Sequence, residues 1–309
     1  MIATERAKAI SSGRRLSPTK LFNKYRKSIA PEGGWTQEFF SGLAADALLT
    51  DISSVINVAK LNGVRSLVSE LDSLVNQQFD DLIEQGHSNY STITGTRNED
   101  APSSDRLLLL IWLLALRQIS AKYTIQLTLT STPIVQSVVD NVYRKIMDLL
   151  GVAPTKSQIT VMVNRARNFA ESLSQINNTT DERLTQTISG SNASTMAGIA
   201  ALLLAKKPYI FTSRVGTIAR TEIGKATDIA VISAYRDSKA VSHVSVVGCQ
   251  AIEDNSPTYS GIPTCNIQNV PIQDVGKLKF HPNHTGIIVP SAFFLENGSA
   301  PKLTVSRGR

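Results

Sequence analysis

Two cysteines and two histidines fall close together near the C-terminal end of the chain, and together they could hold a metal ion. They follow one another as Cys-x15-Cys-x15-His-x2-His, at Cys249, Cys265, His281 and His284. Two thiolates and two imidazoles form a tetrahedral zinc set, and a small module with little core gains stability from such a metal. Structural zinc is therefore one prediction for this segment.

A second interpretation of the same residues needs no metal. The spacing is not that of a standard zinc finger, so His281 could hydrogen-bond its own turn while the two cysteines serve as small buried apolar residues. The N-terminal residues lack the apolar stretch of a secretory signal, which favours reduced thiols. A catalytic metal is disfavoured because the chain has no His-Glu-x-x-His pattern and no acid beside the histidine pair.

Other catalytic patterns are absent from the sequence. It contains no Gly-x4-Gly-Lys-Ser/Thr loop, no Gly-x-Ser-x-Gly elbow and no Gly-x-Gly-x-x-Gly turn. Glu253 and Asp254 are adjacent in a predicted loop, where solvated charges are commoner than an acid and base pair. We therefore expect that the protein is not an enzyme.

The net charge of the chain is concentrated in an N-terminal arm. Positions 1–30 carry eight Lys or Arg side chains and one acid, which gives the whole net charge of +7, while positive and negative charges balance over positions 31–309. A basic arm on a neutral body typically meets phosphate or another anion, although a solvated tail is the alternative. The candidate contact residues are Arg14, Arg15, Lys20, Lys24, Arg26 and Lys27.

Apolar spacing predicts helices through the first two thirds of the chain. Residues 35–82 are expected to form a long helix or a helical hairpin broken at Asn62-Gly63, and residues 86–105 a polar surface loop with a solvent-facing His87. A buried core helix is expected at 105–120. Its apolar run, residues 107–116, is shorter than the roughly 20 residues that span a bilayer, so we expect no membrane contact.

Further helix signals follow this segment. Thr132-Pro133 predicts a helix start, with the end at Gly151. Two helices are expected at 156–176 and 181–206, the second broken at 190–192 and closed by Pro208, and a last helix from 212 or 213 to about 237. On that helix Glu222 has Lys225 as a neighbour, whereas Arg220 must face solvent or find its partner elsewhere.

Short β-like runs at 241–247, 277–280 and 286–290 follow the helices. The predicted fold class is therefore α+β, a mostly helical N-terminal and middle region followed by a small β-rich C-terminal module. We expect three parts: a basic arm at 1–34, a helical domain at 35–207, and a helix plus β-rich module at 208–309.

The order of motifs in the last third resembles the Mu F-like phage minor head (head morphogenesis) family. The similarity covers residues 180–292 and consists of the helix "TIARTEIGKATDIAVISAY", a cysteine-bearing loop and the turn "FHPNHTGIIVP". The resemblance implies that Arg220, Thr221 and Glu222 are the helix signature, that Cys249 is the loop cysteine, and that His281, Pro282 and Asn283 are the histidine turn. The chain departs from the family at two places. His284 begins the segment where members often have Cys-x-Cys, and Ile252 stands at the position of the usual second cysteine. Cys265 is the candidate to replace that second cysteine.

The resemblance implies a structural protein of a tailed-phage virion, inside or at the portal vertex of the head, that is made in the host cytoplasm. Its expected partners are the portal protein, the major capsid protein and the backbone of double-stranded DNA. Two other functions remain open at this point: a metal-dependent hydrolase using His281 and His284, and a cellular DNA-binding helical protein with a zinc-stapled end. Copurification with portal or capsid protein distinguishes the first function from both others, and chelator-sensitive turnover identifies the hydrolase.

Overall fold

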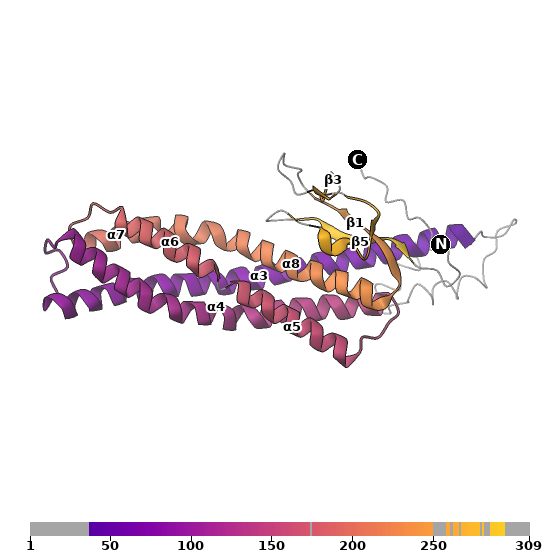
Figure 1. Cartoon of the computed structure of the whole chain (residues 1–309), viewed down its shortest axis with the longest axis horizontal. Coiled ribbons are helices and arrows are strands. Elements are labelled where there is room, and N and C mark those ends of the chain that lie inside the picture. Colours follow the sequence, from indigo (N-terminus) through magenta and orange to yellow (C-terminus); the bar gives the residue numbers. More distant parts are fainter. Residues whose placement is uncertain are drawn as a thin grey trace, which may run out of the picture.

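The structure is a computed structural model that describes residues 37–173, 175–249, 258–259, 262–265, 267–278, 280 and 285–293. It confirms the predicted α+β class, with long helices followed by a small antiparallel sheet. The helices lie side by side in an elongated bundle, and the sheet packs against the bundle near the end where the first described helix begins (Figure 1).

The first described helix, α3 (Gln37–Thr94), is continuous over 58 residues, so of the two predicted alternatives the long helix is confirmed and the hairpin broken at Asn62-Gly63 is wrong. Gly63 marks a close approach of three helices instead. A Cβ built on it would lie 2.7 Å from Val138 Cγ2 of α4 (Asp105–Leu149) and 3.0 Å from Ile223 Cγ2 of α8 (Ser213–Ser238). The missing side chain therefore allows tight packing, which outweighs the roughly 1 kcal/mol by which glycine disfavours a helix.

The second helix, α4, is also longer than predicted, because Pro133 lies inside it and does not begin a new helix. The ring of Pro133 removes the backbone donor that would bond the Leu129 carbonyl. The helix continues because its apolar face is buried on both sides of the proline, at Leu127 and Val135. The preceding hydroxyls of Ser131 and Thr132 donate to carbonyls one turn earlier, each at 2.6 Å. The predicted end at Gly151 is confirmed, since this residue has a φ of +76° and follows the last helical turn.

The segment 105–120 forms the predicted helix, but only one of its faces is buried. Ile111 and Trp112 are fully buried, whereas Leu110 on the opposite face is 60% exposed. Within the described residues, α4 is also the helix whose length and hydropathy would allow it to cross a membrane, and 39% of its most apolar window is buried inside the protein.

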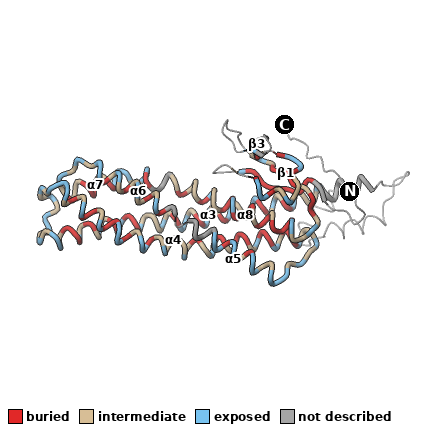
Figure 2. The backbone as a smooth tube through the Cα atoms, in the orientation of Figure 1, coloured by how far each residue is buried: buried red, intermediate tan, exposed pale blue. Residues whose placement is uncertain are grey.

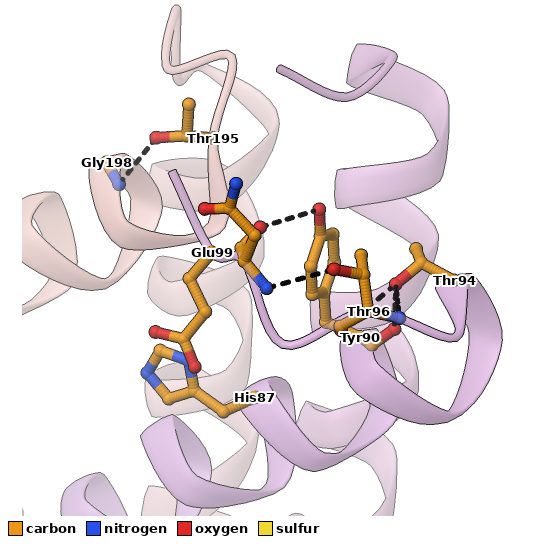
Figure 3. A network of polar contacts seen from close by, with 8 residues as sticks. His87, Tyr90, Thr94, Thr96, Glu99, Thr195 and Gly198 are labelled. Carbon is orange, nitrogen blue, oxygen red and sulfur yellow. Dashed lines mark hydrogen bonds and ion pairs between the residues drawn. The ribbon is translucent and has the colours of Figure 1, made fainter. Parts of the chain in front are cut away.

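The connection between α3 and α4 is shorter than the predicted loop at 86–105, because α3 continues to Thr94. His87 is on this helix, so the predicted loop position is wrong; its side chain is 27% exposed and its Nδ1 lies 2.6 Å from Glu99 Oε1. Nearby, the Tyr90 hydroxyl lies 3.3 Å from the carbonyl oxygen of Asn98 (Figure 3). The backbone amide of Ser103 donates to Ser194 at 2.9 Å. The first two contacts hold the connection against α3, and the third holds it against the residues that precede the later helix beginning at Met196.

After residue 151 the predicted start at 156, the break at 190–192 and the last helix from 213 are confirmed. The predicted gap between 176 and 181 is wrong, because one helix runs across it. Helices α5 (Lys156–Leu173) and α6 (Gln175–Ser189) precede α7 (Met196–Lys207), and the break between α6 and α7 covers the predicted Gly190-Ser191-Asn192. The end of α7 at Lys207 is also as predicted. A π-helix, η1 (Pro208–Thr212), then leads directly into α8, so the chain remains helical across Pro208.

The sheet forms from segments on both sides of the cysteine-bearing region. β1 (Val241–Val247) lies between β4 (Val270–Pro271) and β5 (Ile287–Phe293), and both neighbours are antiparallel to it. A separate hairpin pairs β2 (Thr258–Tyr259) with β3 (Ile262–Pro263). The strands predicted at 241–247 and 286–290 are confirmed. The strand predicted at 277–280 is wrong, because the chain there leaves a 3-10 turn, η2 (Val275–Lys277).

Two apolar clusters fill the bundle, and the larger one joins the helices to the sheet. It contains residues of α3, α4, α5 and α8 together with β1 and β5, so the helix and sheet of 208–309 share their core with the preceding helices (Figure 2). The division of the chain into separate domains stays a prediction. The second cluster is centred on Trp112 and Phe79 at the far end of the bundle.

A layer of buried polar side chains lies between the two clusters along the bundle. Asn177 Nδ2 donates to the Ser120 carbonyl at 2.8 Å and to the Thr124 hydroxyl at 2.9 Å, while Gln78 Nε2 donates to Asn177 Oδ1 at 2.8 Å. The Ser120 hydroxyl also donates to Asp181. Sliding one helix past another would leave these buried groups unpaired, so the layer specifies how the helices align.

Candidate functional site

The predicted signature residues lie on α8, a helix of the bundle that also contacts the sheet. Glu222 and Lys225 form the expected ion pair, with Lys225 Nζ 2.9 Å from Glu222 Oε1. Thr221 donates to the backbone carbonyl of Thr217 at 2.8 Å. Arg220 is exposed and lies back along its own helix over Gly216, where a Cβ would be 3.3 Å from an Arg220 terminal nitrogen.

An ion pair that the sequence did not predict ties α8 to α3 and to the sheet. Lys60 Nζ lies 3.2 Å from Asp228 Oδ1 and donates to the backbone carbonyl of Gly286 at 2.8 Å, immediately before β5 begins. The two side chains are 14% and 8% exposed. Burial raises the pKa of Asp228 above its ordinary value, and the neighbouring Lys60 ammonium opposes that shift.

A tyrosine of α8 also bonds to β5. The Tyr235 hydroxyl, at the C-terminal end of α8, donates to the Ile288 carbonyl of β5 at 3.0 Å, and its side chain is fully buried. Burial raises the pKa of Tyr235, so the phenol stays a neutral donor. Two buried polar contacts, from Lys60 and Tyr235, thus fix where β5 sits on the bundle.

A groove of about 800 Å³ lies beside this junction, between α5, α8 and the turn that contains η2. Its size is that of a small-molecule or peptide site. Arg165 donates to Ser233 across it at 2.8 Å, and Arg236 Nε donates to the Ile272 carbonyl at 3.3 Å. The remaining lining residues are mostly apolar or neutral: Asn168, Thr221, Gly224, Lys225, Ile229, Ile232, Val275, Gly276, Leu278 and Phe280, with Asp228 beneath.

The charges of this groove suit binding an anion better than catalysing a proton transfer. Arg165 and Arg236 stand at its rim and bond to neutral oxygens, while Lys225 is already paired with Glu222. Asp228 is the carboxylate among the described lining residues, and its ion pair with Lys60 occupies it. A general acid and base need two titratable groups poised near the operating pH, which these described residues do not supply.

The structure joins Cys249 and Cys265 in a disulfide, with their Cα atoms 5.7 Å apart. The expectation of reduced thiols is therefore wrong for this structure. A disulfide sulfur is not a thiolate, so neither cysteine can bind zinc in this state. His281 and His284, with Pro282 and Asn283, lie outside the described residues. Among the residues that are described, no group of three His, Cys, Asp or Glu side chains could hold a metal ion. Structural zinc, bound after reduction of the disulfide, stays a prediction.

No protein-family model, no curated protein and no solved structure matches this chain. The resemblance to the Mu F-like family therefore rests on the sequence motifs quoted above alone, and it stays a prediction.

The cationic residues of the basic arm also lie outside the described residues. Their point of attachment is nevertheless visible, since α3 begins at Gln37 near the end of the bundle that carries the sheet (Figure 1). The arm and the sheet are therefore joined to the same end of an elongated body.

Sequence reasoning missed Lys60, Asp228, Arg165 and Arg236. Their partners come from distant parts of the chain, since the ion pair joins Lys60 near the middle of α3 to Asp228 on α8. The one sequence signal was Asp228 itself, a single acid within the apolar stretch "ATDIAV" of a predicted helix.

Proposed function

We propose that this protein is a structural minor head protein of a tailed bacteriophage, associated with the portal vertex and acting in head assembly, DNA packaging or DNA delivery. The observation that supports this proposal is spatial. The signature helix α8, the strand β1 that leads to Cys249, and the strand β5 that follows the histidine turn pack together as one unit on α3. Segments that the resemblance links only by their order in the sequence thus form one local structure.

The elongated shape fits a structural role. The bundle is long and has an apolar core along its length, and a polar layer within it fixes how the helices align. Such a body can serve as a stiff spacer with different surfaces at its two ends. In the proposal, the sheet end bears the basic arm and meets the DNA backbone or an acidic face of the portal or the major capsid protein. Backbone recognition of this kind ignores base sequence and weakens steeply with salt.

The DNA part is tested with the full chain and two unrelated duplexes in fluorescence anisotropy. Six arm cations on phosphates predict a loss of about 10³ in affinity between 50 and 200 mM salt. A variant with all six changed to glutamine keeps the arm's length and should lose most of that salt dependence. Equal salt slopes for the two proteins would refute DNA binding by the arm. The six residues are Arg14, Arg15, Lys20, Lys24, Arg26 and Lys27.

The virion part needs a separate test. The full chain is coexpressed with the portal protein encoded by the same genome, and the portal is purified at low and at high salt. Copurification that survives nuclease treatment supports the proposal. Failure to copurify with either portal or major capsid protein would overturn the virion assignment, whatever the DNA result.

A further inference from the structure

The outward face of α4 carries large apolar side chains that the bundle leaves uncovered. Leu110, Leu114, Ile125 and Leu129 are 60%, 39%, 62% and 68% exposed. With the exposed Gln118 and Ala121 they form what we call the α4 stripe. At 3.6 residues per turn the six positions fall within about 100° of arc and extend over about 28 Å. Large apolar side chains exposed together on one helix face, here in two pairs separated by Gln118 and Ala121, mark an interaction site.

The spacing of the α4 stripe is the same in both directions along the helix. Successive positions are separated by steps of 4, 4, 3, 4 and 4, so the stripe is symmetric about a point between residues 119 and 120. In an antiparallel pair of α4 helices, Leu110 would face Leu129 of the second copy, and Leu114 would face Ile125. A surface that complements itself under a two-fold rotation is the requirement for a C2 interface. We propose that the α4 stripe is the interface of an antiparallel homodimer.

Charged residues border the stripe and argue against a lipid surface as its occupant. The exposed Arg117 and Lys122 lie at opposite margins, near the middle of the stripe, and Lys122 Nζ is 2.5 Å from Asp81 Oδ2 of α3. Burying these charges in hydrocarbon would be costly, whereas a charged rim around an apolar centre is ordinary for a protein interface. The chain's own basic arm is a poor occupant, because its net positive charge over positions 1–30 would meet the exposed Arg117 at the margin of the stripe.

The sheet leaves this face of the bundle accessible to a second copy. Its described strands contact α3 and α8, and the groove beside them is lined by α5, α8 and the η2 turn. A dimer formed through α4 would therefore keep both sheet ends available, pointing in opposite directions because the helices are antiparallel. This inference does not rest on the proposed function, and the experiments below involve neither portal nor DNA.

The first experiment measures self-association of the full chain by sedimentation equilibrium. We expect a concentration-dependent dimer with a micromolar dissociation constant, since one helix pair gives an interface at the small end of the specific range. Ile125→Glu should raise the dissociation constant at least about tenfold. Leu204→Glu, at a similarly exposed apolar position (55%) on α7, is the matched control and should leave it unchanged. A wild-type chain that stays monomeric, or equal effects of the two variants, would overturn the proposal.

The second experiment tests the antiparallel alignment. Leu114→Cys protein is mixed with Ile125→Cys protein under mild oxidation, which should give a disulfide-linked heterodimer because the two positions face each other. Each variant by itself should cross-link poorly, since its own thiols would be about 16 Å apart, beyond disulfide reach. Efficient cross-linking of Leu114→Cys to itself would indicate parallel helices and refute the alignment. If the protein floats with neutral lipid vesicles and Ile125→Glu does not, the stripe binds a membrane and not a second copy, which would also refute the proposal.

Discussion

Replacing Lys60 by methionine should destabilise the protein far more than a typical lysine substitution. Methionine keeps most of the side chain's apolar length but removes the ammonium group that pairs with Asp228 and donates to Gly286. Removing one partner of a buried ion pair costs about 3–5 kcal/mol, because it leaves the other charge buried and uncompensated. Since Lys60 is 14% exposed, we take the lower end, about 3 kcal/mol.

The loss should depend on pH in a defined direction. Burial already raises the pKa of Asp228 above 3.8, and without Lys60 the opposing influence is removed, so the pKa rises further. The folded variant then keeps a proton on Asp228 at pH values where the unfolded chain has lost it. Its stability is highest below the unfolded pKa and falls as pH rises towards the folded pKa, so the cost should be smaller at pH 5 than at pH 7.

The assay is urea unfolding followed by circular dichroism at pH 5 and pH 7. Lys277→Met is the matched control, because Lys277 forms a surface ion pair with Asp274 and its side chain is 68% exposed, so its loss should cost under about 1 kcal/mol. Adding Asp228→Asn to Lys60→Met should restore much of the stability at pH 7. Equal losses for the Lys60 and Lys277 variants, or a Lys60→Met cost that does not change with pH, would refute the reasoning.

Two further predictions concern packing and the cysteines. Gly63→Ala should destabilise the protein by about 1–3 kcal/mol, measured by thermal unfolding, because its Cβ would overlap neighbouring helices. Gly216→Ala is the control: its Cβ would meet only the flexible end of an arginine, so this change should be neutral or slightly stabilising. A gain in stability for Gly63→Ala would contradict the packing argument. For the cysteines, thiol titration of the unfolded chain should find no free thiol without reductant and two with it, and Cys249→Ser or Cys265→Ser should each cost about 3 kcal/mol. Two free thiols before reduction would contradict the disulfide. Elemental analysis after reduction tests the zinc prediction, for which we expect about one zinc per chain in the parent protein and none in either cysteine variant.

The sequence by itself determined the fold class and many element boundaries. Helix ends were predictable where a local signal suffices, as at Gly151, whose positive φ suits glycine, and around Gly190-Ser191-Asn192. The Glu222 and Lys225 pair was predictable for the same reason, because its geometry follows from helical spacing. The concentration of positive charge in the N-terminal arm is likewise a property of the sequence alone.

Tertiary packing decided the positions where a local signal pointed elsewhere. Asn62-Gly63 and Thr132-Pro133 have the composition of helix boundaries, yet both lie inside long helices. Close packing at Gly63 and the burial of Leu127 and Val135 on either side of Pro133 outweigh the low helix propensity of these residues. The Lys60 and Asp228 pair and the groove beside α8 each join residues far apart in the chain. Periodicity describes one element at a time, so it cannot predict which elements meet or what is buried between them.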